Sequence, residues 1–128
     1  MQERLTEDGS IYVQISQMIE TDILRGILLE EERVPSTNEL AKLYTINPAT
    51  AAKGINLLVE EGTLYKKRGI GMFVATGAVE RIRAKRKESF YQKRLSELLT
   101  EAERLGITRQ ELAAHILREE TKNGEAGM

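Results

Sequence analysis

The side chains with the most distinctive chemistry in this sequence are basic and lie beside glycine. Lys66, Lys67 and Arg68 are followed by Gly69-Ile70-Gly71. Ammonium and guanidinium groups bind phosphate oxygens, and glycine allows a tight turn and a close approach of the backbone to another surface. The combination favours contact with the phosphate backbone or a groove of nucleic acid. The alternative is a solvated strand edge, on which lysine discourages pairing with another strand.

A second set of polar side chains lies on one face of a helix that the sequence predicts from Pro48 to Glu61. At about 100° per residue, one side of this helix carries the apolar residues Ala51, Ala52, Ile55, Leu58 and Val59. The opposite side carries Ala49, Thr50, Lys53, Asn56 and Leu57. Small, polar and basic side chains suit the major groove of DNA, because acidic ones would repel phosphate. The alternative is the exposed face of an ordinary helical bundle.

Start and stop signals place this helix third in a short series of elements. Apolar residues at steps of three and four predict a helix from Ile11 to Arg25, and a connecting loop is expected at 28–33. Ser36-Thr37-Asn38-Glu39 is a capping box that opens a second, short helix, and Asn47-Pro48 caps and opens the third. Residues 63–74 suggest two short strands joined by the basic turn. This order is typical of a winged helix-turn-helix domain.

The apolar periodicity changes beyond Gly77. Tyr91, Leu95, Leu98, Ala102 and Leu105 are spaced by four, three, four and three residues, which predicts a heptad-like seam on a long helix that begins near Val79. Gly106 ends that helix, and the capping box at 108–111 opens a last one. Two helices cannot cover so wide an apolar stripe, so we expect a homodimer whose interface contains Phe90, Tyr91, Leu95, Leu98, Leu99 and Ala102.

The predicted fold is therefore mainly α, with two parts. Residues 1–77 form a winged helix-turn-helix domain of three helices plus a two-stranded β wing, and residues 78–128 form a C-terminal helical hairpin that serves as a dimerisation element. Gly54 reflects close packing against the first helix, which we favour, or close approach to DNA. A basic run follows residue 80 and comprises Arg81, Arg83, Lys85, Arg86 and Lys87. Three interpretations stay open: a solvated linker helix, a set of phosphate contacts that flank the operator half-site, or a segment that pairs with acidic surface on the other subunit.

Composition argues against several other classes of function. The 128 residues include 19 basic and 20 acidic ones, so any attraction to nucleic acid must be local. There is no cysteine and one histidine, His115, so we expect no metal, no cofactor and no enzyme activity. Gly69 and Gly71 lack the strand-helix context of a nucleotide-binding loop. No stretch resembles a membrane span or a signal peptide, and we expect a cytoplasmic protein with no membrane partner.

In this order and spacing, the motifs resemble the DNA-binding domain of the GntR family of bacterial transcription regulators. The short C-terminal part resembles the YtrA-type subgroup. The resemblance rests on the segments 11–15, 35–36, 39–41, 47–50, 61–62 and 69–74. It implies a homodimeric repressor that binds double-stranded DNA at an inverted-repeat operator, and YtrA-type regulators often control transporter operons.

The resemblance also implies which residues contact DNA, namely Ser36, Thr37, Asn38, Asn47, Ala49, Thr50, Lys53, Arg68 and Gly69. We add Lys66 and Lys67 to the predicted DNA contacts because both are basic and lie next to Arg68 in the wing. Many family members carry arginine at the positions of Asn38, Pro48 or Ala52, so this chain lacks guanidinium groups that commonly read guanine. A protein-interaction adaptor and a non-specific architectural DNA-binding protein are the alternative functions. A small-molecule effector stays unknown, since about 50 residues can hardly enclose a drug-sized pocket.

Overall fold

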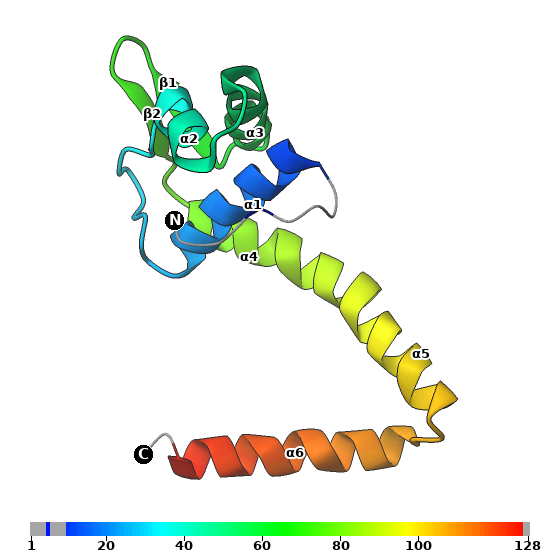
Figure 1. Cartoon of the computed structure of the whole chain (residues 1–128). Helices are drawn as coiled ribbons and strands as arrows, with labels where there is room; N and C mark the ends of the chain where they lie inside the picture. Colours follow the sequence, from blue (N-terminus) through cyan, green and yellow to red (C-terminus); the bar gives the residue numbers. More distant parts are fainter. Residues whose placement is uncertain (1–4, 6–9, 127–128) are drawn as a thin grey trace. The chain divides into compact units, whose positions relative to one another are not determined.

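The computed structural model describes residue 5 and residues 10–126, with side chains as far as Arg118. Figure 1 shows a mainly helical chain with one two-stranded antiparallel sheet in the described part, as predicted. The elements are α1 (Ile11–Leu24), α2 (Thr37–Tyr44), α3 (Pro48–Glu60), β1 (Leu64–Lys67), β2 (Gly71–Val74), α4 (Ala78–Ser89), η1 (Phe90–Leu95), α5 (Ser96–Arg104) and α6 (Arg109–Ala126).

The three N-terminal helices share one hydrophobic core. Ile15, Ile19 and Ile23 project from α1 at steps of four, and each is at most 2% exposed. Leu40 from α2 and Leu58 from α3 pack into the same cluster and are fully buried. Burying a side chain of this size is worth roughly 1.5–3 kcal/mol relative to leaving it exposed. The core therefore holds α2 and α3 together as a helix-turn-helix pair.

The wing is an antiparallel hairpin whose base belongs to the same core. Leu64 of β1 pairs with Val74 of β2, and both side chains are buried. Towards the tip, Lys67 pairs with Gly71, and the four-residue strands end there. The hydrophobic base orients the hairpin, while the basic tip stays exposed.

The segment before Pro35 differs from the simple loop that the sequence predicted. The amides of Glu31 and Val34 donate to carbonyl oxygens of β2 at 2.7 and 2.9 Å, and Arg33 forms an antiparallel bridge with Phe73. This segment thus runs along the edge of β2 that β1 leaves open. It covers polar backbone groups that an edge strand would otherwise expose.

The helical segment after the wing contains a π-helical turn. α4, η1 and α5 follow one another without a break, and η1 has π geometry where the sequence predicted uninterrupted α-helix. A π turn accommodates an extra residue, which rotates the following side chains by about 100° relative to a continuous α-helix. The heptad-like spacing from Tyr91 to Leu105 therefore does not form one straight stripe.

The chain divides into two compact units, 1–85 and 86–128. The first two turns of α4 belong to the first unit, because Ala78 and Ile82 are buried in its core. Residues 78–85, which were predicted to belong to the C-terminal element, thus pack with the winged domain. In the second unit, α5 and α6 are the two arms of a V that meet at the link around Gly106 (Figure 1).

Candidate nucleic-acid interface

The N-terminus of α2 is closed by the predicted capping box. The amide of Glu39 donates to Ser36 Oγ at 3.1 Å, and the amide of Ser36 donates to Glu39 Oε1 at 3.2 Å. The hydrogen bond from the Ser36 amide, followed by the interaction with the Ser36 hydroxyl, holds the pKa of Glu39 below its usual value. Thr37 is half-buried and Asn38 is exposed in the first turn. The positive end of the helix dipole at this turn suits an anion such as phosphate.

The N-terminus of α3 is built as the sequence predicted. The amide of Ala49 donates to Asn47 Oδ1 at 2.8 Å, and Pro48 is the first helical residue. Ala49 and Lys53 are exposed, whereas Thr50 is half-buried. Four of the helix's residues are buried on the core side: Ala51, Gly54, Ile55 and Leu58. Over its first two turns, the side of α3 that faces away from the core is thus small, polar and basic.

Tyr12 belongs to this surface but is not among the site residues predicted from the sequence. Lys53 Nζ lies 4.3 Å from the centre of the Tyr12 ring, a distance at which the ring attracts the ammonium group. The two side chains line an open groove beside α3, together with Ala49, Ala52, Asn56, Leu57 and Glu60. The only signal for Tyr12 in the sequence is an aromatic residue in the first turn of a predicted helix.

Gly54 lets α3 approach α1 closely. A Cβ atom at this position would lie 2.8 Å from the carbonyl oxygen of Tyr12 and 3.0 Å from Ile15 Cγ2. Real Cβ atoms do not tolerate the first of these distances, and a backbone carbonyl within a helix cannot easily move away. The structure therefore supports the packing interpretation of this glycine.

The basic side chains of the wing do not form one cluster. Tyr65 and Phe73 stack across the two strands with ring centres 6.0 Å apart, and Lys67 Nζ lies 4.3 Å from the centre of the Phe73 ring. Because successive side chains of a strand alternate, Lys66 lies on the opposite face from Lys67. Arg68 is exposed in the turn beyond β1. The wing thus presents positive charge on both faces and at its tip.

The base of the wing is held by a carboxylate from the preceding segment. Thr76 Oγ1 donates to Glu31 Oε2 at 2.6 Å, and the Tyr65 hydroxyl donates to Glu31 Oε1. The bonds from Thr76 and Tyr65 lower the pKa of Glu31, and the bond to Glu31 raises the pKa of Tyr65. The sequence carried no signal for this three-residue contact, since its members are far apart along the chain.

Much of the basic run in α4 has partners in its own unit. Arg83 pairs with Glu80 of the same helix at 2.8 Å. The Arg81 guanidinium donates to the carbonyl oxygen of Gly62, and Lys85 contacts two glutamates of the winged unit. These contacts favour a structural role for the start of α4 over a set of flanking phosphate contacts.

The second unit leaves large apolar side chains exposed. Among the predicted interface residues, Phe90, Tyr91 and Leu98 are 54%, 62% and 46% exposed. Leu95 and Leu99 are half-buried, whereas Ala102 is already covered by its own unit. Leu105, Ile116 and Leu117 of the same unit are exposed as well. Exposed apolar side chains of this size are compatible with the predicted interface, which nothing in the single chain tests.

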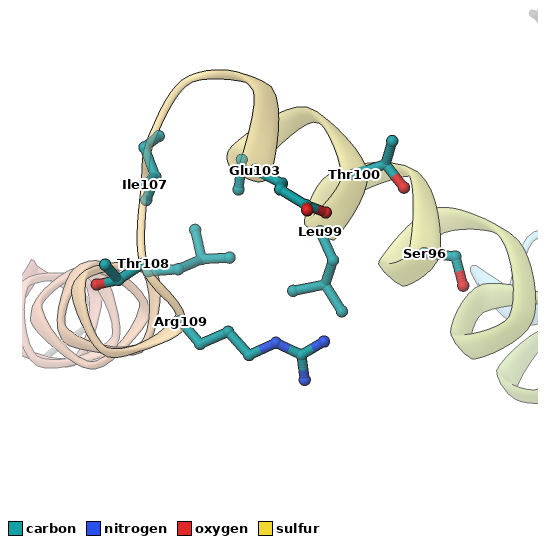
Figure 2. Close-up of a pocket in the computed structure, with 9 residues that line it drawn as sticks. Ser96, Leu99, Thr100, Glu103, Ile107, Thr108 and Arg109 are labelled. Atoms are coloured by element: carbon teal, nitrogen blue, oxygen red, sulfur yellow. The ribbon is translucent and has the colours of Figure 1, made fainter.

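An open hollow of about 550 Å³ lies in the angle between α5 and α6. Figure 2 shows Leu99 of α5 and Arg109 of α6 projecting into it, with Glu103, Ile107 and Thr108 along its rim. It opens to one side and does not enclose a ligand. Within the described residues, no group of three or more metal-binding side chains is found, and no helix is long and apolar enough to cross a membrane.

The winged unit alone and most of the chain both match known proteins. The family model "Bacterial regulatory proteins, gntR family" matches residues 11–74. The repressor YtrA of Bacillus subtilis is 29% identical over 102 residues, which are 80% of this chain and 78% of YtrA. The arabinose metabolism transcriptional repressor of Halalkalibacterium halodurans is 42% identical over 64 residues, which are 50% of this chain and 17% of the repressor. The chain thus corresponds to a small part of that relative.

Solved structures show the same pattern. A GntR-family transcriptional regulator from Bacteroides thetaiotaomicron is 34% identical, with a TM-score of 0.73 over 88% of this chain and 98% of that one. The DNA-binding domain of AraR, in complex with operator ORX1, is 34% identical and has a TM-score of 0.50 over 59% of this chain and 92% of that one. These proteins are transcription regulators and not enzymes, in agreement with the prediction.

Proposed function

Because this chain belongs to the gntR family of bacterial regulatory proteins, we propose that it is a sequence-specific DNA-binding repressor of transcription that acts in the cytoplasm. The exposed side of α3 carries the proposal. Its first turn is capped by Asn47, and Ala49 and Lys53 face away from the core. A rigid helix with a small, polar and basic outer side fits the major groove.

In this proposal three elements contact one operator half-site. Ser36, Thr37 and Asn38 bind a phosphate at the N-terminus of α2. Asn47, Ala49, Thr50 and Lys53 approach base edges and phosphates from α3. The wing reaches the backbone or the minor groove with Lys66, Lys67, Arg68 and Gly69. The operator-bound AraR domain, which has a related fold, supports this assignment.

The base readout follows from the residues present. Asparagine pairs through two hydrogen bonds with adenine, and small apolar side chains contact the methyl group of thymine. Asn38 is exposed at α2, and Ala49 is exposed at the start of α3. The chain carries asparagine, proline and alanine at positions 38, 48 and 52, so these positions offer no guanidinium group to guanine. We therefore expect contacts to A·T pairs to contribute more than guanine recognition.

The repressor acts as a homodimer in this proposal. The exposed side chains Phe90, Tyr91 and Leu98 form the centre of the contact between two copies. Two recognition helices related by a twofold axis then read an inverted repeat. The resemblance to YtrA-type regulators makes a transporter operon the expected target.

The proposal is tested by selecting duplexes from a randomised pool with the full chain and measuring gel shifts across a salt series. We expect an enriched inverted repeat that binds more tightly than a scrambled duplex, with affinity that falls steeply as salt rises. Equal affinity for both duplexes at every salt concentration would point to an architectural DNA-binding protein and contradict the proposal.

A double variant separates DNA binding from a role as a protein adaptor. Lys53→Glu together with Arg68→Glu reverses two exposed charges on α3 and the wing tip. If the proposal holds, the variant loses binding to the selected duplex while its thermal melting curve is unchanged. Regulation in cells that survives this double change would instead favour the adaptor.

A further inference from the structure

The start of α4 is fixed to the winged unit by polar contacts at successive turns. The two carboxylate oxygens of Glu30 accept hydrogen bonds from the amides of Gly77 and Val79 at 2.9 and 3.1 Å. These bonds close the N-terminus of α4 and lower the pKa of Glu30. One turn later, Arg81 donates to the carbonyl oxygen of Gly62, directly after α3. Both contacts join α4 to segments distant in sequence.

Lys85 adds a third contact, and it joins two other helices. Its Nζ contacts the carboxylate of Glu20 in α1 and lies 2.9 Å from Oε2 of Glu61, the C-terminal cap of α3. Glu20 is 2% exposed, so Lys85 neutralises a carboxylate that the fold removes from water. Burial alone would lower the pKa of Lys85, but hydrogen bonds and charge attraction from Glu20 and Glu61 outweigh it and raise the pKa.

The ion pairs of Lys85 fix the orientation of α4 more than they stabilise the fold. A buried ion pair is weak support for stability, because desolvation of both charges opposes their attraction. Its demand for a defined geometry, however, restricts how the helices can rotate against one another. Ile82 packs on the adjacent side of α4 and is 1% exposed, but an apolar contact alone is not directional. Lys85 therefore ties the direction of α4 to the end of the proposed recognition helix.

We infer that Lys85, Glu20 and Glu61 are positioning residues that determine which spacing of operator half-sites the homodimer accepts. The inference rests on the proposed function. α4 continues past Lys85 to Ser89 as one helix. In this inference the helix is the connection through which the contact at Lys85 acts on the spacing of the two DNA-binding units. One extra base pair rotates a half-site by about 35°. If the direction of α4 is fixed, a dimer binds an operator with such a shift more weakly. If α4 can change direction, the dimer binds both spacings with similar affinity.

The test uses the full chain and duplexes that carry the selected half-sites with spacers varied one base pair at a time. We compare wild type with the double variant Glu20→Gln, Lys85→Met, which removes both charges and leaves no buried carboxylate unpaired. Arg83→Ala is the matched control, because the ion pair between Arg83 and Glu80 lies within α4 and joins it to no other element. A duplex with a single half-site reports on α3 itself.

We expect a one-base-pair change of spacer to weaken wild-type and Arg83→Ala binding by about tenfold. In the double variant the same change should weaken binding by less than about threefold, with single half-site affinity unchanged. A preserved tenfold preference in a folded double variant would overturn the inference while leaving the proposed function intact. If no inverted repeat is enriched with wild type, the proposed function itself fails.

If the double variant melts at a lower temperature than wild type, the variant Glu61→Gln tests the inference instead. Glu61→Gln keeps the pair between Lys85 and the buried Glu20 but removes the charge at the end of α3. We expect it to lower the spacing preference by at least about twofold while the melting temperature stays near that of wild type. An unchanged spacing preference in folded Glu61→Gln overturns the inference.

Discussion

At the scale of single residues, the absence of a side chain at Gly54 matters as much as the charges around it. Gly54→Ala should gain about 1 kcal/mol of helix propensity but lose about 1–3 kcal/mol through overpacking. The overpacking should dominate, because the new Cβ would meet the carbonyl oxygen of Tyr12 at 2.8 Å. We expect the free energy of unfolding in urea to fall. Asn56→Ala, at an exposed position of the same helix, should leave it unchanged or raise it slightly.

Lys53 has the most specific expected role of any single charge. If it binds a phosphate, Lys53→Gln should reduce the slope of log affinity against log salt concentration by about 0.9, the effect of one displaced counterion. Arg104→Gln removes one charge from an exposed helix of the other unit and should leave the slope unchanged. Gel shifts at four salt concentrations measure both. Equal slopes for wild type and Lys53→Gln would remove Lys53 from the interface.

At the scale of elements, the segment between α1 and α2 holds the wing and α4 through two neighbouring carboxylates. Glu31 accepts hydrogen bonds from Thr76 and Tyr65, and Glu30 accepts them from the first turn of α4. Both glutamates form these bonds in their ionised state. The arrangement of wing and α4 should therefore depend on pH in the acidic range.

The sign of this dependence follows from the pKa values. The pKa of Glu30 is lowered by the amides of Gly77 and Val79, and that of Glu31 by Thr76 and Tyr65. The stabilisation is present above the unfolded pKa of 4.5 and is lost as pH falls through the lower folded values. Thermal melting of wild type should drop more steeply between pH 5 and pH 3 than that of Glu30→Gln, Glu31→Gln.

Glu97→Gln serves as the control for that comparison, because Glu97 is an exposed glutamate of α5 outside the winged unit. Its acid-induced fall in melting temperature should match wild type. If the double variant Glu30→Gln, Glu31→Gln and the control Glu97→Gln show the same dependence of melting temperature on pH, the carboxylate contacts of Glu30 and Glu31 do not stabilise the fold.

At the scale of the whole molecule, function depends on how two copies meet. Leu98→Asp places a charge in the exposed apolar surface of the second unit, where Leu98 is 46% exposed. Burying that charge in a dimer contact would be costly, so sedimentation equilibrium should report a monomer. Affinity for the full inverted repeat should fall to that of a single half-site. Both measurements use the intact chain.

Leu29→Asp is the matched control for the dimer prediction. Leu29 is an exposed leucine of the winged unit, at 58%. The same charge there should leave the mass in solution and the operator affinity unchanged. A dimeric Leu98→Asp protein would instead shift the interface to other exposed residues, such as Ile116 and Leu117 on α6.

Local signals in the sequence were sufficient to locate where α2, α3 and α6 begin. Ser36, Asn47 and Thr108 each accept a hydrogen bond from an amide within three residues, so the interaction that begins the helix lies within the pattern itself. The exposed side of α3 followed from the same kind of reasoning, because helical periodicity relates residues only a turn apart. The family resemblance rests on those same short segments.

The tertiary structure alone decided the contacts between distant segments. Glu20 and Lys85 are 65 positions apart, and Tyr12 meets Lys53 only because Gly54 lets α3 approach α1. No periodicity relates such residues, since their contact depends on how whole elements pack. The π-helical turn at 90–95 was not predicted either, because its residues suit an α-helix equally well. The sequence by itself thus determined the helix caps, because the residues of a cap are neighbours in the chain. The tertiary structure determined the contacts between distant side chains, because these depend on how the helices pack.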